Sequence, residues 1–200
     1  MKRLAMFAVL VAYAEAVQAA PETYIIDNSQ TSSLFSYRPL GASSLTHRFD
    51  KTSGKVVIDR ATGTGTADVT IDAASVNTGH ALFNEKIQGT DFFDSARYPV
   101  ISFKSRRMKL DGEQPSLAGD LTIKGVTRPV TLAISRFQCM PDPTFRVDAC
   151  GARASVTIKR SDFNMGKFPF LVSNDITLDL TIRAVKEAPR LQLASNAPPM

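Results

Sequence analysis

A strict two-residue alternation of apolar and polar side chains near the C-terminus constrains the fold more than any other feature of this sequence. Between Asp175 and Arg183 every second residue is Ile or Leu, and the residues between them are Thr or Asp. A period of two places one row of side chains on a buried face and the other in water, which is typical of a β-strand. The same alternation returns in shorter stretches at 55–59, 67–71, 100–103, 121–123, 130–134, 145–147 and 156–158.

These stretches predict an all-β fold of about eight antiparallel strands, the first of them at Ser33–Tyr37. Turn-forming residues separate them, for example at 62–65 and 111–112. Strands with one apolar face and almost no helix to cover it must bury that face against each other. A closed barrel does so and also removes exposed strand edges, but a packed sandwich would show the same pattern. Alternation therefore leaves both architectures open, and it does not tell whether a barrel is hollow.

One short helix is expected near residues 79–89. Its apolar and basic side chains recur at helical spacing, at Leu82, Phe83, Lys86 and Ile87. Thr78 is a suitable N-terminal cap, and Gly89 would end the helix. No linker marks a second domain.

The N-terminal residues 1–19 have the features of a secretory signal peptide. Lys2 and Arg3 precede an apolar run over 4–14, and the small residues Val17 and Ala19 suit the −3 and −1 positions of a cleavage site. Eleven apolar residues are too few to cross a bilayer as a helix. We therefore expect export to the periplasm, a barrel domain over 22–187 and a flexible, proline-containing tail over 188–200.

Composition excludes several functional classes. The chain has 200 residues, 44% of them hydrophobic, and a net charge of +5, which fits one ordinary globular domain with no expected nucleic-acid partner. Two cysteines and two histidines make a zinc module or a multi-histidine metal centre unexpected. In an exported protein, Cys139 and Cys150 are expected to form a structural disulfide that closes a loop between two strands. A redox-active pair would need a shorter spacing.

No catalytic arrangement is evident from the motifs. The sequence lacks a Gly-x-Ser-x-Gly elbow, and His47 and His80 fall in two separate segments that we predict to lie outside strands. Asp91 and Asp94 could be paired carboxylates, but turn and cap roles around two phenylalanines explain them better. We therefore predict that the protein is not an enzyme and carries no cofactor or metal.

Two segments expected to be loops are unusually apolar, namely those with Phe92, Phe93 and Tyr98 and with Phe163, Met165, Phe168, Phe170 and Leu171. Such side chains either cap one end of a barrel core or form the apolar mouth of a ligand site. Arg160 and Asn164 lie nearby in the sequence and are candidate polar anchors for a ligand.

Four motifs in this order resemble those of the YceI-like family of polyisoprenoid-binding proteins. They occupy 71–79, 90–103, 117–130 and 159–165, and the resemblance spans about residues 22–187. It implies an extended lipocalin-like antiparallel barrel with an elongated apolar cavity and a periplasmic role in carrying long lipids. The chain departs from the family pattern at His47, where a glycine is usual, and at Asn164, which replaces a common glycine.

With the resemblance, the sequence predicts a carrier of a long apolar lipid such as a polyisoprenoid, a quinone-like lipid or a fatty amide. Phe35, Phe103 and Leu178 are expected to line the cavity, and a second set to line or gate its end, namely Phe92, Phe93, Phe163, Met165, Phe168 and Phe170. Transient contact with a membrane surface is a further expectation. A packed stress or structural protein and an accessory to quinone-linked redox enzymes remain alternatives, and the oligomeric state is open.

Overall fold

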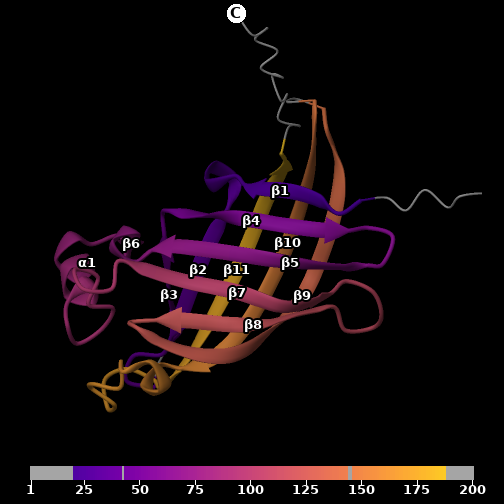
Figure 1. The fold of residues 1–200 in the computed structure, drawn as a ribbon. Coiled ribbons are helices and arrows are strands. Elements are labelled where there is room, and N and C mark those ends of the chain that lie inside the picture. Colours follow the sequence, from indigo (N-terminus) through magenta and orange to yellow (C-terminus); the bar gives the residue numbers. More distant parts are fainter. Residues whose placement is uncertain (1–19, 42, 144–145, 188–200) are drawn as a thin grey trace, which may run out of the picture.

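Eight strands close into an antiparallel barrel in the computed structural model, which describes residues 20–41, 43–143 and 146–187. Going around the barrel, the strands follow the order β1 (Glu22–Ile26), β4 (Thr52–Asp59), β5 (Thr64–Asp72), β7 (Val100–Lys109), β8 (Ser116–Ile123), β9 (Val126–Asp142), β10 (Val147–Lys159) and β11 (Asp175–Lys186). Pairing of β1 with β11 completes the ring (Figure 1). The expected all-β barrel with one short helix is confirmed, and the sandwich is excluded.

A smaller group of strands extends from the same edge of β11. Residues 177–181 of β11 pair with β2 (Ser32–Tyr37), whereas residues 184–186 pair with β1. Next to β2 follow β3 (Leu45–Phe49) and the two-residue β6 (Val76–Asn77). The prediction that Ser33–Tyr37 begins the set of strands is wrong, because β1 precedes it. Strand β1 shows no clear alternation, because it has only five residues and ends in two adjacent isoleucines.

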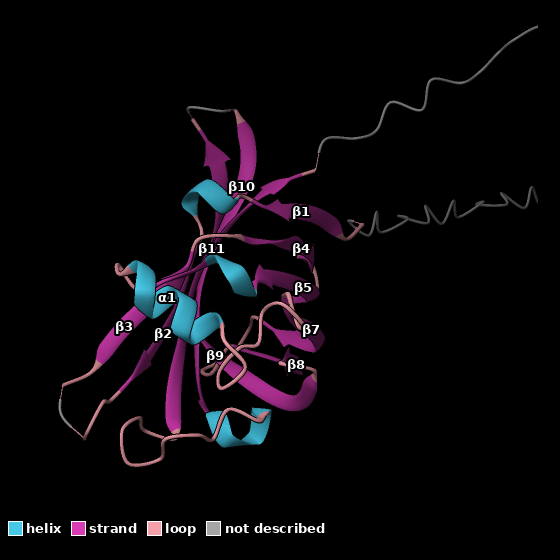
Figure 2. Ribbon diagram, turned by 90° about the vertical axis from the view of Figure 1, so that its left-hand side faces the viewer, coloured by secondary structure: helices cyan, strands magenta, loops and turns pink. Residues whose placement is uncertain are grey.

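The short helix α1 (Ala81–Gln88) lies beside β6 at one end of the barrel, which faces the viewer in Figure 2. Gly89 ends it as expected, but its N-cap is His80 and not Thr78. Thr78 instead donates from its backbone N–H and its hydroxyl to Asn84 Oδ1, both over 2.8 Å, and so ties the helix to β6. Three short 3-10 helices complete the fold: η1 (Asn28–Gln30), η2 (Ala73–Ser75) and η3 (Arg160–Phe163).

Inward-facing residues of the barrel divide into two groups along its length. At the end away from α1, buried side chains including Tyr24, Ile58, Met108 and Leu117 fill the interior and line no cavity. Closer to α1, the same strands contribute Phe103 and Leu121, among others, to the wall of a cavity. Gly119 leaves room for the Phe103 ring of the neighbouring strand, because a Cβ at this position would lie 2.5 Å from that ring.

The disulfide Cys139–Cys150 is present as predicted, but it lies inside the strands and not beside them. The two cysteines are paired residues of β9 and β10, with Cα atoms 4.0 Å apart. These strands run beyond the rest of the barrel as a long hairpin, at the top of Figure 1. The predicted signal peptide at 1–19 and the predicted tail at 188–200 lie outside the described residues. Among the helices that are described, none is long and apolar enough to cross a membrane.

Candidate functional site

The interior of the barrel near α1 holds a cavity of about 150 Å³. Strands β2, β5, β7, β8, β9, β10 and β11 supply most of its wall through their inward rows of Val, Ile, Leu and Phe side chains. Phe83 and Ile87 of α1 close part of the end. The few residues with polar side chains that reach the lining are Ser33, Tyr37, Ser102 and Arg160. The barrel is therefore hollow in this half, and its hollow is apolar.

The structure brings six of the predicted ligand-binding residues together in this lining: Phe35, Phe92, Phe93, Phe103, Met165 and Leu178. Phe163 is almost fully buried in the core, at 1% exposure, but it does not reach the cavity. Phe168 lies one layer outside the lining, where its ring stacks on Phe92 with centroids 6.1 Å apart. Phe170 is 90% exposed and does not line the cavity. That these residues contact a ligand stays a prediction.

Arg160, a predicted polar anchor, reaches the cavity lining with its side chain directed into the loop that follows η3. It is buried without a carboxylate partner among its contacts, and burial lowers the pKa of its guanidinium. All five of its N–H groups donate to backbone carbonyls, those of Met165, Lys167, Phe168, Val172 and Ser173. In this conformation Arg160 has no donor left for a ligand, and its contacts fix the loop over 160–174.

Asn164, the second predicted anchor, lies outside the lining and is exposed. It adopts a left-handed conformation, with φ 56° and ψ 31°, at the C-terminal end of η3. Asn and Gly tolerate this conformation better than other residues. The backbone requirement therefore explains why Asn can stand where a Gly is common in the family that the motifs resemble.

Ion pairs join the loop after α1 to the loop after η3 across one end of the cavity. Asp91 accepts from Lys167 and from Lys86 of α1, and these contacts, that of Lys167 foremost, lower the pKa of its carboxyl group. Lys124 donates to the backbone oxygens of Thr90 and Asn164, over 2.6 and 3.1 Å. Figures 1 and 2 show both loops at the α1 end of the barrel. Asp91 thus has a partner on each side of the opening.

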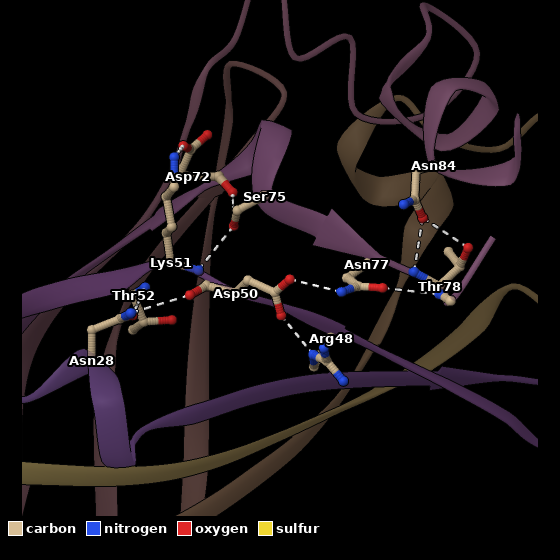
Figure 3. Close-up of polar contacts among 11 residues, drawn as sticks. Asn28, Arg48, Asp50, Lys51, Thr52, Asp72, Ser75, Asn77, Thr78 and Asn84 are labelled. Atoms are coloured by element: carbon tan, nitrogen blue, oxygen red, sulfur yellow. Dashed lines mark hydrogen bonds and ion pairs between the residues drawn. The ribbon is translucent and has the colours of Figure 1, made fainter. Parts of the chain in front are cut away.

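A polar network holds the small strands β3 and β6 to the barrel (Figure 3). Asp50, in the turn after β3, accepts from Arg48 and from Asn77 Nδ2 of β6, which lowers the pKa of the Asp50 carboxyl group. Asn28 of η1 accepts from the Thr52 N–H over 2.6 Å and donates to the Asp50 carbonyl over 3.1 Å. Because α1 is tied to β6, this network also positions the helix that covers the cavity.

His47 occupies a position that the sequence analysis did not predict. It lies in β3, directly opposite Phe35 of β2, and not outside the strands. Its Nε2 is 3.2 Å from the hydroxyl oxygen of Tyr37, and its ring packs edge-on against Phe35 and Phe83. Burial lowers the pKa of His47 and raises that of Tyr37. The contact between His47 and Tyr37 becomes evident only when the β2–β3 register, which pairs His47 with Phe35, is known.

Exposed apolar side chains surround the outside of this end. Phe170 and Leu171 follow Phe168 in the loop after η3, and the N–H of Leu40 donates to the carbonyl of Leu171 over 3.1 Å. Lys86 lies over the Phe168 ring at 5.6 Å, and Leu82 lies one helical turn before it. We call Leu40, Leu82, Phe168, Phe170 and Leu171 the apolar rim; each is between 38% and 90% exposed. Among the described residues no cluster of His, Cys, Asp and Glu is suited to a metal ion.

Comparisons with known proteins agree with this architecture. The chain is 34% identical to the protein YceI of Escherichia coli O157:H7 over 120 residues, which are 60% of this chain and 62% of that protein. The match therefore spans about three fifths of the relative's length. The crystal structure of BcnA from Burkholderia cenocepacia superposes with a TM-score of 0.69 at 26% identity, covering 79% of this chain and 98% of that one.

A second solved structure shares the fold alone. It is described as a polyisoprenoid binding domain from Saccharophagus degradans implicated in plant cell wall breakdown. Its TM-score is 0.59 at 20% identity, and the match covers 82% of this chain and 98% of that one. The model of the YceI-like domain family matches residues 24–184, which confirms the resemblance carried by the four motifs. The chain belongs to the YceI-like domain family.

Proposed function

We propose that this protein carries a long, largely apolar lipid in the cavity of its barrel. The observation that carries the proposal is the half-hollow barrel, whose cavity is walled by Phe, Leu, Ile and Val side chains. A polyisoprenoid, a quinone-like lipid or a fatty amide would fit such a wall. The description of the Saccharophagus degradans domain as polyisoprenoid binding supports this class of ligand.

Binding of this kind needs no catalytic group. Removing apolar surface from water stabilises a complex by roughly 25 cal/mol per Å², and this contribution does not depend on direction. The chain type of the tail is therefore expected to matter little, provided that it fits. The presence of a cavity also speaks against the packed structural barrel, because a protein without a ligand gains from filling its core.

The apolar rim suggests how a lipid enters and leaves. Its five side chains are exposed on α1 and on the segments next to Val172, at the end of the barrel where Phe92 and Val172 reach the cavity, and Lys86 lies over the ring of Phe168. Exposed apolar groups next to lysines favour the interface of a lipid membrane. We propose that this end touches a membrane surface transiently during transfer of the ligand.

Export to the periplasm completes the proposal. The sequence of residues 1–19 suits a cleavable signal, and the Cys139–Cys150 disulfide suits an oxidising compartment. The mass of the mature protein would show where cleavage occurs.

Native mass spectrometry of the protein purified from periplasm tests the carrier function. We expect an additional bound mass that organic extraction releases as a prenyl chain, a quinone or a fatty amide. Leu178→Glu places a charge in the cavity wall and is expected to abolish the bound mass. Thr181→Glu, on the exposed outer row of the same strand, is the control and should keep it. An empty wild-type spectrum, together with no uptake of added isoprenoids, would refute the carrier function.

A further inference from the structure

Tyr37, whose hydroxyl is hydrogen-bonded to His47 behind it, is the polar feature of the cavity wall that the carrier function leaves unexplained. Both residues lie on the inward face of the β2–β3 hairpin, since His47 is paired with Phe35 and Tyr37 is two residues further along the strand. Tyr37 lines the cavity and is 8% exposed. Its hydroxyl lies 3.2 Å from His47 Nε2. Tyr37 therefore borders the apolar hollow, and His47 lies behind it, outside the lining, as the partner of its hydroxyl.

Other polar side chains among the described lining residues are engaged or turned away. The hydroxyl of Ser33 lies 2.9 Å from that of Thr52 in the buried core. All five N–H groups of Arg160 donate to backbone carbonyls. Ser102 lies between two inward residues of β7, so the alternation of the strand directs its side chain outward. By contrast, the bond to His47 uses one of the three hydrogen-bonding positions of the Tyr37 hydroxyl.

The pair can serve either kind of uncharged partner. If His47 Nε2 carries a proton and donates to the Tyr37 oxygen, the Tyr37 hydroxyl is free to donate to a carbonyl. If Nε2 accepts from Tyr37, the lone pairs of the hydroxyl can accept from an alcohol or an amide N–H. Burial lowers the pKa of His47 and so favours the neutral ring, which offers no charge to balance a phosphate. A phosphate in this setting would be desolvated without a free cationic donor, because all five N–H groups of Arg160 are already engaged.

We infer that the Tyr37 hydroxyl, positioned by His47, binds the uncharged polar head of the carried lipid, a hydroxyl, carbonyl or amide, and that the site discriminates against lipids with a phosphorylated head. The inference rests on the proposed carrier function and assigns a head-group position to it. The aromatic rings of Phe35 and Phe83, which pack against His47 with centroids 5.6 and 5.7 Å away, hold the imidazole in place. The tail would then extend from this pair along the apolar wall.

Three fifteen-carbon probes with the same tail test the inference: the hydrocarbon farnesene, the alcohol farnesol and farnesyl diphosphate. Their dissociation constants can be measured by displacement of a fluorescent apolar dye, since the chain contains no tryptophan to interfere. For the wild-type protein, we expect farnesol to bind about fivefold to tenfold more tightly than farnesene, the ratio that one net hydrogen bond supplies. Farnesyl diphosphate should bind more weakly than farnesol.

Tyr37→Phe removes only the hydroxyl and should abolish the preference for farnesol while leaving farnesene affinity within twofold. Tyr98→Phe, a half-buried tyrosine outside the lining, is the matched control and should keep the preference. His47→Phe should weaken the preference, because the Tyr37 hydroxyl loses the partner that positions it, and His47→Gln should recover part of it, because an amide can still bond to the hydroxyl. Melting temperatures would verify that each variant folds.

Two results would overturn the inference while leaving the carrier function intact. One is an unchanged ratio of farnesol to farnesene affinity in Tyr37→Phe, and the other is diphosphate binding as tight as that of farnesol. If none of the probes binds and the purified protein contains no lipid, the carrier function itself fails and the head-group site fails with it.

Discussion

Strands such as β7 and β8 run through both halves of this barrel, but the interior of one half is filled and that of the other is hollow. In the half away from α1, Tyr24, Ile58, Met108 and Leu117 fill the interior, and each is less than 10% exposed. In the half near α1, inward residues such as Leu121 are equally shielded from water but face a cavity. Solvent exposure alone does not distinguish the halves. The halves differ in whether the inward side chains touch those of the opposite barrel wall or face empty space.

Polar bonds support the loops and the helix that border the hollow half. Arg160 gathers five carbonyls of one loop, Asp91 joins two loops, and Asp50 holds β6 and, through it, α1. A cavity forfeits the dispersion contacts that a filled core would make. Directional bonds at its edges can keep the wall in place without filling it. One domain therefore contains a candidate binding site in its hollow half and a packed core in its filled half.

The largest effect is expected from Arg160→Met, which removes the polar framework of one loop while keeping an unbranched side chain. Five backbone carbonyls would lose their donor in a buried position, and we expect the free energy of unfolding to fall by about 3 to 5 kcal/mol. Denaturation with urea measures this change. Lipid binding should also weaken, because Met165 and Val172 line the cavity from the same loop.

Lys159→Met is the matched control, since Lys159 is the neighbouring residue and its side chain is exposed. It should change the free energy of unfolding by less than about 0.5 kcal/mol. If Arg160→Met were as mild as this control, the loop would be held by packing, and the contrast between the two halves would disappear.

Truncating one apolar side chain in each half to alanine compares how tightly the two halves are packed. Ile58→Ala and Leu121→Ala remove the same number of carbon atoms from residues that are 1% and 6% exposed. We expect Ile58→Ala to cost about 3 to 4 kcal/mol of unfolding free energy, because it opens a void in a filled core. Leu121→Ala should cost about 1 to 2 kcal/mol, because one side of Leu121 already faces empty space.

Urea denaturation of both variants without lipid gives the two values, and equal losses would mean that the cavity wall is packed as tightly as the filled half. Adding a bound lipid should raise the cost of Leu121→Ala but not that of Ile58→Ala, since the lipid would supply the missing contacts only in the hollow half.

Much of this fold could be predicted from the sequence, because alternation is a local property. The strand at 175–183, the short helix and the disulfide all follow from patterns within a dozen residues. Alternation could not show that the barrel is hollow, since Met108 and Leu121 occupy inward positions of the same kind in neighbouring strands. The difference depends on what stands across the barrel, which is set by residues far away in the sequence.

The candidate site was predicted in part for the same reason. Phe35, Phe103 and Leu178 were expected in the lining because each lies on the apolar face of a strand, and the structure places them there. The neighbours of Phe170 in the sequence predict a place near the mouth, and it lies there in the exposed apolar rim and not in the cavity lining. His47 was missed because β3 has no clear alternation, and its contact with Tyr37 appears only once the β2–β3 register is known.

The smallest effect on lipid binding is expected from removal of the disulfide, because it lies at the filled end of the barrel. Replacing Cys139 and Cys150 by serine removes a crosslink between residues that are 11 positions apart in the sequence. The chain-entropy model then gives a loss of about 2 to 3 kcal/mol in unfolding free energy. Isoprenoid affinity should stay within twofold, since neither cysteine lines the cavity. Displacement of the fluorescent dye measures the affinity, and Ser135→Ala in the same hairpin is the control. A large loss of affinity in the serine variant would show that the filled end supports the shape of the cavity, and the two halves would then be one cooperative unit.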